Sequence, residues 1–478
     1  MVAFSRWTVF ALVSIAACGG GSSPPADGQS TVGGATAAGG EGGAAAGAGA
    51  GAGSGAGAGS GAGAGAGAAA AAGAAAGAAA AAAGAAAAAG AAAAAGAGGG
   101  AGTAGGGSAG SAAFVHPGVL VQKGQLAFVK AKIAAGVAPW SDAFAKAKAD
   151  THGSPSYTPK PRAVVECGSY SNPDFGCTDE KNDAAAAYTH ALLFSFTGEE
   201  AYAKKAIEIM NAWSSTITQH TNSNAPLQSA WCASVWPRAA EILRYGYPGW
   251  SAADVAQFGA MLKKVYLPEV VAGSPGSNGN WELSMVEATM AIAVFLDDEA
   301  TFAGAVAMWK KRVPAYFYLQ SDGPIPAPPP GTKVSGQAAL VKYWQGQSTF
   351  VDGLCQETCR DLGHTQLGLA AAIDAAETAK IQGVDLYALE AKRLTATLEF
   401  HAGFLDGAAV PSWLCNGSLS MATPTHTWEI AYNAYANRQK HALPSTLALL
   451  AKVRPTGVNH MMVWETLTHA EVGAAGLP

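Results

Sequence analysis

Charge is scarce in this sequence, and positive charge is not concentrated anywhere. Asp, Glu, Lys and Arg make up only 13% of the 478 residues, and the formal net charge is −5 at pH 7. No run of Lys and Arg forms the basic stripe that nucleic-acid-binding proteins use, so nucleic acid is not an expected partner. The slightly acidic balance still permits an anionic ligand, because a local group of cations can dominate one cleft.

Large apolar residues are almost absent between residues 19 and 113, where Gly, Ala and Ser predominate. Such a segment cannot bury enough apolar surface to offset the entropy that ordering it would cost. We therefore interpret residues 19–113 as a low-complexity, disordered tether. The alternating Gly and Ala from Gly47 onward are also similar to silk-like segments, which is the alternative interpretation. The folded domain is expected to occupy residues 114–478.

The N-terminus lacks an apolar run long enough to remain as a membrane-spanning helix. Arg6 is followed by the mainly apolar residues 7–17 and then by Cys18, a length that is typical of a signal peptide. Residues 15–18, Ile-Ala-Ala-Cys, resemble a bacterial lipobox, which implies cleavage before Cys18 and lipid on its sulfur. The alternative is an ordinary signal peptide. We expect a periplasmic or cell-surface protein that a lipid anchors to the outer membrane.

Cysteine is also scarce, and no Cys-x-x-Cys pair is present, so the sequence gives little indication of a zinc site. Export makes the other cysteines candidates for disulfides, and their even number is consistent with full pairing. A bond between Cys167 and Cys177 would close a short loop. Cys355 and Cys359 would bond to Cys415 or Cys232.

No alternating strand pattern repeats in residues 114–478, whereas helical periodicity recurs along most of them. One run has apolar residues three and four apart: Tyr202, Ala206, Ile209, Trp213 and Ile217. Helices that follow one another with short turns predict an all-α domain. By architectural analogy we expect an (α/α) toroid, an incomplete barrel of about six to seven helical hairpins with a cleft at one end.

The most informative polar residues are Gln356, Arg360 and His364, each four residues from the next. In a helix this spacing places an amide, a cation and an imidazole on one face, which is typical of a polar site. The alternative is structural: Arg360 pairs with Glu357 or Asp361, and His364 is an ordinary helix residue.

Other candidates stand near the predicted helix ends. Asn280 and Trp281 follow a Gly-rich loop, so the amide either caps a helix or faces the cleft, and the indole either stacks on a sugar or packs in the core. Trp231 would lie near a cleft wall. Tyr432 belongs to an aromatic stripe of a helix that His426 precedes. Such a stripe is more often core, although tyrosine with histidine suits proton abstraction next to a carboxylate.

Several of these segments together resemble the bacterial alginate lyase superfamily of (α/α)-toroid polysaccharide lyases. They are NGNWELSMVEATMAIAVFLDDEATF, GQAAL, QETCRDLGHTQLGLAAAIDAAETA, WPRAAEILR and TWEIAYNAY. The similarity extends from Leu126 to Arg438 and is greater to uronan- and glucuronan-cleaving relatives. In the best-known members a catalytic histidine follows the loop asparagine. Trp281 occupies that place here, which favours His364 or a tyrosine as the base.

The resemblance implies β-elimination of a 4-linked uronic-acid polysaccharide of the alginate or glucuronan type, without metal or cofactor. It assigns Arg360 as the carboxylate clamp and Asn280 as a second donor. His364 would be the base or the carboxylate neutraliser, and Tyr432 the acid. The expected substrate-binding residues are Gln356, Trp281, His426 and Trp231.

Two alternative functions remain open. An (α/α)-barrel glycoside hydrolase acting on uronate oligosaccharides would need two carboxylic acids that face each other across the cleft. The available residues are Asp352, Glu357, Asp361 and Glu429. A non-catalytic polysaccharide-binding lipoprotein would need aromatic residues in the cleft, without His and Arg.

Overall fold

The computed structural model describes residues 113–424 and 428–472. The predicted signal peptide with Cys18, nearly all of the predicted tether at residues 19–113, and His426 lie outside the described residues. Among the described residues, no helix combines the length and the apolar character that crossing a bilayer requires.

The described part of the chain is mostly helical, as predicted. Its helices are α1 Lys123–Ala134, α2 Trp140–Ala149, α3 Cys177–Thr197, α4 Glu200–Ser214, α5 Ala225–Gly246, α6 Ala252–Met261, α7 Leu267–Val270, α8 Gly279–Phe295, α9 Glu299–Tyr316, α10 Gln337–Tyr343, α11 Leu362–Ile381, α12 Leu386–Leu389, α13 Ala391–Leu405, α14 Trp428–Tyr432, α15 Pro444–Val453 and α16 Glu465–His469. Strands β1 Val164–Cys167, β2 Asp174–Phe175 and β3 Gln219–Thr221 form a small sheet in the order β2-β1-β3. Strands β4 Val458–Asn459 and β5 Met462–Val463 form a hairpin.

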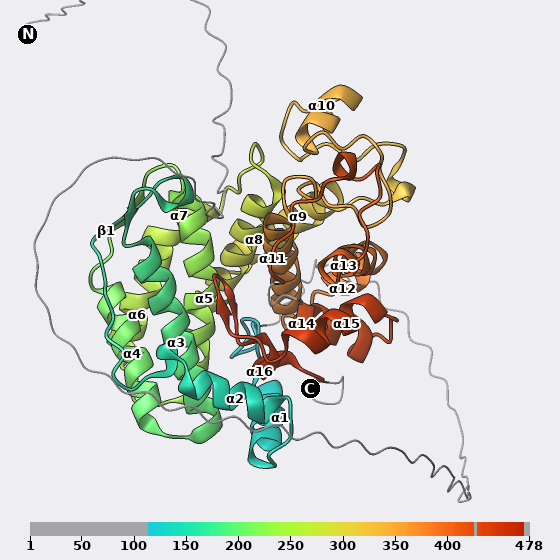
Figure 1. The fold of residues 1–478 in the computed structure, drawn as a ribbon. Coiled ribbons are helices and arrows are strands. Elements are labelled where there is room, and N and C mark those ends of the chain that lie inside the picture. The colour runs from blue at the N-terminus through green and yellow to red at the C-terminus, as the bar shows by residue number, and fades with distance from the viewer. Residues whose placement is uncertain (1–112, 425–427, 473–478) are drawn as a thin grey trace, which may run out of the picture. The chain divides into compact units, whose positions relative to one another are not determined.

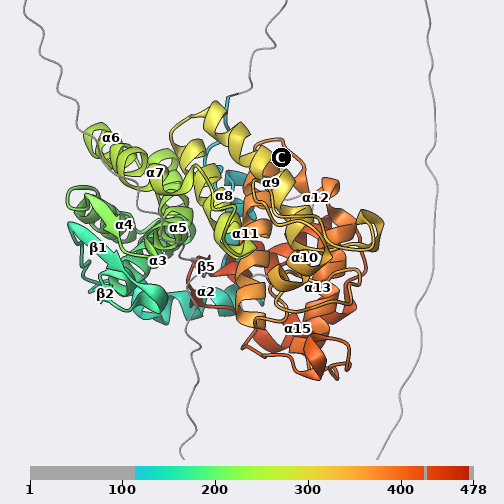
Figure 2. The same ribbon diagram turned by 90° about the horizontal axis from the view of Figure 1, so that it is seen from above.

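The long helices are arranged in an inner and an outer layer, which confirms the predicted (α/α) toroid (Figures 1 and 2). In the inner layer α3 packs on α5, α5 on α8, and α8 on α11. In the outer layer α4 packs on α3, α9 packs on α8, and α6 packs on α4. Helices outside the inner layer lead from each inner helix to the next, and the inner helices run in the same direction.

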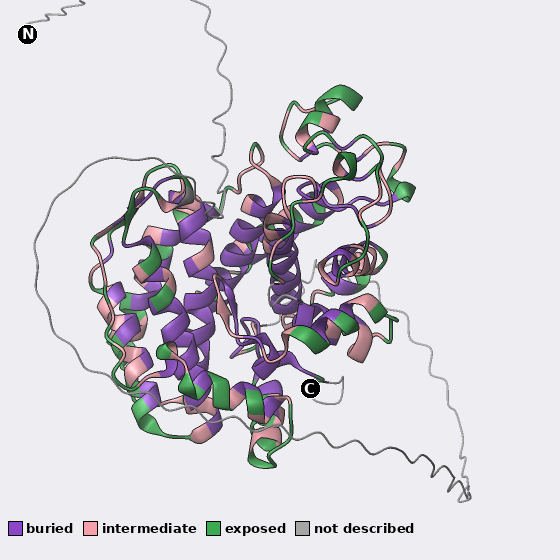
Figure 3. Ribbon diagram, in the orientation of Figure 1, coloured by how far each residue is buried: buried purple, intermediate pink, exposed green. Residues whose placement is uncertain are grey.

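The side chains explain which helices lie inside. α8 is buried along nearly its whole length, and α3 and α11 carry buried alanine runs at residues 184–187 and 370–372. Helices that are apolar on all sides are stable only when other elements surround them, and small side chains allow close approach. On α4 only one stripe is buried, including Tyr202, Ile209 and Trp213. Figure 3 shows buried residues concentrated on α5, α8 and α11.

The C-terminal segment with β4, β5 and α16 fills the space beside the inner helices. Trp464 Nε1 donates to Thr189 Oγ1 of α3 (2.7 Å), and Arg238 Nη1 of α5 donates to the Met461 carbonyl oxygen (2.9 Å). His469 is buried and contacts the carbonyl oxygen of Leu120 (3.1 Å). This C-terminal segment, which contains β4, β5 and α16, is therefore part of the core.

Behind this segment lies a buried cluster that has more carboxylates than cations. The guanidinium of Arg238 donates to Glu287 of α8 (2.5 Å) and to Asp374 of α11 (3.1 Å). Burial, followed by neighbouring negative charge, raises the pKa of Glu287 and of Glu465 well above the usual range, and burial raises the pKa of Asp374 to about 6. One guanidinium does not neutralise three carboxylates, so the cluster retains protons at neutral pH.

We predict that Glu465→Gln stabilises the domain at pH 8 and has less effect at pH 5. A carboxyl group whose pKa is raised by folding contributes stability below its unfolded-state pKa and loses it as the pH rises toward the folded-state pKa. The amide keeps the shape of the protonated acid and does not ionise. The expected gain at pH 8 is at least about 1 kcal/mol, because one pKa unit corresponds to about 1.4 kcal/mol.

Denaturant unfolding at both pH values measures this effect, with Asp142→Asn on the exposed face of α2 as the control. Equal changes in unfolding free energy at pH 5 and pH 8 for Glu465→Gln would contradict the account of the cluster.

Candidate functional site

A cavity of about 490 Å³ lies where the inner helices begin. The first turns of α3, α5, α8 and α11 line it, together with the turn before α11, the β4–β5 hairpin and the loop that contains β2. The lining residues are Ser169, Ser171, Asp174, Thr178, Lys181, Asn224, Leu227, Trp231, Asn280, Trp281, Arg360, Asp361, Gly363, His364, Leu367, Ala422, Thr423, Asn459 and His460.

The cavity is suited to an anionic ligand. Four inner helices direct their N-terminal ends toward it, and helix N-termini carry partial positive charge and backbone N–H groups without intrahelical partners. Lys181 and Arg360 add two full positive charges to its wall. These are the groups of the cavity wall that can bind a carboxylate or other anion.

Two carboxylates also line the cavity, and each is held by a neighbour. Asp174 accepts from Oγ1 of Thr178 (2.5 Å), and Asp361 contacts Nδ1 of His364 (2.6 Å). Burial alone would raise their pKa values, but these hydrogen bonds lower the pKa of Asp174 and of Asp361 below the ordinary value. Both groups are ionised at neutral pH.

The prediction that Arg360 and His364 share a helix face is wrong in its local structure. α11 begins at Leu362, and Asp361 is its N-cap, accepting from the backbone N–H of His364 (2.7 Å). Aspartate is among the preferred N-cap residues, so the helix starts after Arg360. Both side chains nevertheless line the cavity, because the turn that contains Arg360 leads directly into the helix.

Glu357 holds several donors around its buried carboxylate. Nδ2 of Asn280 donates to both carboxylate oxygens (2.7 and 2.6 Å), Tyr316 Oη donates to Oε2 (2.7 Å), and Arg360 Nη1 donates to Oε1 (2.8 Å). The structural alternative, pairing of Arg360 with Glu357, is therefore present, and it also fixes the guanidinium at the cavity wall.

The predicted role of Asn280 as a second donor to substrate does not match this geometry. A carboxylate can only accept hydrogen bonds, so the NH₂ end of Asn280 must face Glu357. The amide nitrogen is thereby engaged, although Asn280 does line the cavity. Its role in this structure is to hold the start of α8 against Glu357.

Gln356 is buried outside the cavity lining. It accepts from the backbone N–H of Gly279 (3.1 Å) and donates to Asn278 Oδ1 (3.0 Å) and to the Tyr343 carbonyl oxygen (2.6 Å). The interpretation of Gln356 as a substrate-binding residue is therefore corrected: it fixes the loop that precedes α8.

Tyr432 is also absent from the described residues that line the cavity. Its half-buried ring packs against the core, next to the buried residues Trp428 and Tyr435. The aromatic stripe is core, as its spacing alone indicated, and the assignment of Tyr432 as the acid is corrected. Trp231 and Trp281 line the cavity as predicted.

Sequence reasoning missed several polar side chains at the cavity, among them Lys181, Asn459 and His460. Lys181 lies on α3, and its ammonium group stands over the ring of Trp231 (5.4 Å to the centroid). Asn459 and His460 lie on the β4–β5 hairpin, which carries no helical periodicity. The only local feature that could have indicated Asn459 and His460 is the short polar turn that they form between apolar residues.

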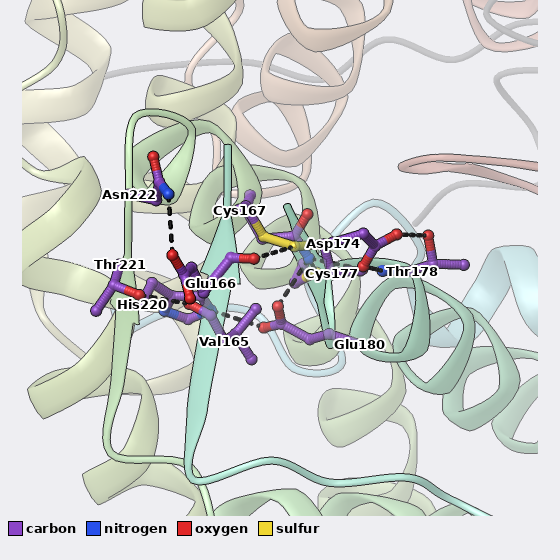
Figure 4. The surroundings of a disulfide bond; sticks show 12 residues. Val165, Glu166, Cys167, Asp174, Cys177, Thr178, Glu180, His220, Thr221 and Asn222 are labelled. Carbon is purple, nitrogen blue, oxygen red and sulfur yellow. Dashed lines mark hydrogen bonds and ion pairs between the residues drawn. A yellow bond between two sulfur atoms is a disulfide. The ribbon is translucent and has the colours of Figure 1, made fainter. Parts of the chain in front are cut away.

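Disulfides fix two of the loops at the site. Cys167 and Cys177 are bonded as predicted and close the loop that carries Asp174 (Figure 4), and Cys359 is bonded to Cys415. Full pairing is wrong for the cysteines that the structure describes, because Cys232 and Cys355 are buried as free thiols. Nor does any group of three or more His, Cys, Asp and Glu in the described ranges have an arrangement that could hold a metal ion.

Comparison with known proteins agrees with the fold and shows a partial match to one family. Residues 139–327 match the family model described as alginate lyase, the superfamily that the sequence resembles. Alginate lyase A1-III from Sphingomonas species A1 is similar in fold, with a TM-score of 0.52 and 14% identity over 75% of this chain and 97% of that chain. An alginate lyase from Bacteroides ovatus has a TM-score of 0.49 and 14% identity over 74% and 100% of the two chains. No curated protein matches this sequence.

We predict that Glu357→Gln destabilises the domain by about 2–3 kcal/mol, because a buried acceptor of charged and neutral donors is replaced by a group that brings its own donor. Denaturant unfolding measures the change. The matched control is Glu200→Gln on α4, whose exposed ion pair with Lys204 contributes little. A Glu357 variant as stable as this control would contradict the role assigned to the carboxylate.

Proposed function

We propose that this protein is a polysaccharide lyase of the alginate lyase superfamily, which cleaves a 4-linked polyuronate by β-elimination in the cavity described above. The observation that carries the proposal is the meeting of Arg360, Lys181 and four helix N-termini with two histidines in one cavity. This combination suits both the negative charge of a uronate and the proton transfers that its cleavage requires.

The chemistry requires a carboxylate to be neutralised. The proton on C5 of a uronic acid is weakly acidic, and removing it places negative charge on the adjacent carboxylate. Arg360 is the strongest partner for that group, because a guanidinium binds a carboxylate through two parallel hydrogen bonds. Glu357 holds one nitrogen of this guanidinium in place (2.8 Å). The helix N-termini add stabilisation that is already oriented before the reaction.

His364 lines the same cavity as Arg360, so its imidazole can reach the substrate near the carboxylate that Arg360 binds. Its Nδ1 is 2.6 Å from Oδ2 of Asp361, which orients the ring. In this arrangement His364 neutralises the substrate carboxylate or protonates the leaving O4, rather than acting as the base. When the C4–O4 bond breaks, its electron pair goes to O4 and a C4=C5 double bond forms.

The carboxylates do not favour a glycoside hydrolase. A hydrolase needs a general acid whose pKa is raised. Among the described lining residues the carboxylic acids are Asp174 and Asp361, and the pKa of each is lowered. Glu357 is buried under its donors, and Glu429 is buried and paired with Arg454.

We predict that Arg360→Ala lowers kcat/KM on the active polyuronate by about 100-fold or more, the scale seen when one stabilising donor is removed. The purified protein would be mixed separately with alginate, polymannuronate, polyguluronate, glucuronan and a glycosaminoglycan, and ultraviolet absorbance of the unsaturated product followed. Lys311→Ala on the outer helix α9 is the control. Reducing ends without new absorbance would indicate a hydrolase, and no turnover would leave a polysaccharide-binding protein.

We also propose that the protein is exported and carries lipid on Cys18, which would place the enzyme at the outer membrane, facing the periplasm or the cell surface. The lipobox-like residues 15–18 and the Gly/Ala-rich residues that follow support this proposal.

We predict that Cys18→Ser abolishes incorporation of radiolabelled palmitate and moves the protein from the membrane fraction to the soluble fraction of a bacterial host. Cys232→Ser, which alters a buried thiol of the folded domain, should leave both properties unchanged. Unlabelled wild-type protein would contradict the lipid anchor and leave the proposed activity untouched.

A further inference from the structure

We infer that His460, at the tip of the β4–β5 hairpin, is the general base that removes the C5 proton of the substrate. This inference rests on the proposed lyase function and adds a catalytic residue that lies outside the segment matched by the family model, residues 139–327. It also gives a role to the C-terminal segment, which the helical pattern of the sequence did not reveal.

The first argument is the location of His460. β4 ends at Asn459 and β5 begins at Met462, so His460 lies in the two-residue connection between them. It lines the same cavity as Arg360 and His364, yet it comes from a different structural element. An acid and a base placed on separate elements can reach different atoms of one sugar linkage.

The second argument is the backbone conformation. His460 has a φ of +52°, in the left-handed region that residues with a side chain rarely adopt. Such a conformation persists where surrounding contacts enforce it, often at functional sites. Here Arg238 Nη1 holds the carbonyl oxygen of Met461 (2.9 Å), and the backbone N–H of Trp464 donates to the Gly457 carbonyl oxygen (2.9 Å). The hairpin tip is therefore fixed from behind by the buried cluster.

The third argument is the orientation of the ring. Nδ1 of His460 is 2.8 Å from Oδ1 of Asn459, an oxygen that can only accept, so Nδ1 carries the hydrogen. Nε2 then carries the lone pair that a base needs. The ring also packs edge-on against Trp231, with centroids 4.8 Å apart and an interplanar angle of 73°. The imidazole is thus held in one tautomer and one position.

The fourth argument is the electrostatic environment. Burial lowers the pKa of His460 to about 4, and the positive charges of Lys181 on α3 and His364 on α11 act in the same direction. The other charged groups of the cavity wall are Arg360 and the ionised Asp174 and Asp361. His460 is therefore neutral at pH 7, the state in which Nε2 can accept a proton, whereas Nδ1 of His364 lies 2.6 Å from the carboxylate of Asp361. The two imidazoles have different charged neighbours, as is typical of an acid–base pair.

The proposed step balances as follows. Nε2 of His460 takes the proton from C5, and the electron pair of that C–H bond forms the C4=C5 double bond. The C4–O4 bond breaks, and O4 receives a proton from His364. Both histidines return to their starting states by exchanging protons with solvent, so no oxidant, reductant or further reactant is needed.

The test compares full-length wild type, His460→Ala, His460→Gln and the exposed control His441→Gln on the polyuronate that the wild type cleaves. We expect both His460 variants to lose at least about 100-fold in kcat, within the range typical of general base catalysis, while KM changes only a few-fold. The His441 variant should match the wild type. Thermal unfolding of each variant checks that the hairpin still folds.

Chemical rescue separates catalysis from a structural role. Added imidazole should restore part of the activity of His460→Ala in proportion to its unprotonated concentration, and should leave His441→Gln unchanged. A kcat of either His460 variant within a few-fold of wild type, or a loss that imidazole does not restore, would overturn the assignment. Wild type that releases no unsaturated product would overturn the proposed function instead, so the two failures are distinguishable.

Discussion

The site depends on one buried carboxylate, that of Glu357. It joins Asn280 at the start of α8, Tyr316 at the end of α9 and Arg360 in the turn before α11. A carboxylate out of contact with water is tolerated only while its donors stay in place, because leaving a buried partner unpaired costs several kcal/mol. The stability of the fold therefore fixes the position of the guanidinium that the proposed reaction uses.

A second constraint comes from the interior of the toroid. The C-terminal segment occupies it, and the charge cluster around Arg238 holds the hairpin that carries His460. Three carboxylates around one guanidinium destabilise a core, because taking charged groups out of water costs free energy that one guanidinium does not offset. The arrangement is understandable if the guanidinium is needed to hold the Met461 carbonyl oxygen and, through it, a strained histidine at the cavity. Stability and function then share the same residues.

Much of the fold could be predicted from the sequence, because amphipathic periodicity and alanine-rich runs identify outer and inner helices locally. Arg360 and His364 both line the cavity, as expected for site residues. The prediction that they share one helix face was wrong, because Asp361 caps the helix and Arg360 lies before its start. Tyr432 was misassigned because an aromatic stripe has the same spacing in a core as in a cleft. His460 was not predictable, because a six-residue hairpin has no periodicity and its position depends on contacts with residues more than two hundred positions away.

The central claim is that the cavity cleaves a uronate linkage by elimination and not by hydrolysis. The most direct measurement is the mass of the products formed in water enriched in heavy oxygen. Elimination takes no oxygen from solvent at the moment of cleavage, so the account predicts unlabelled, unsaturated oligosaccharides when the products are analysed before their reducing ends exchange. Products that carry one solvent oxygen per cleavage and no double bond would contradict it.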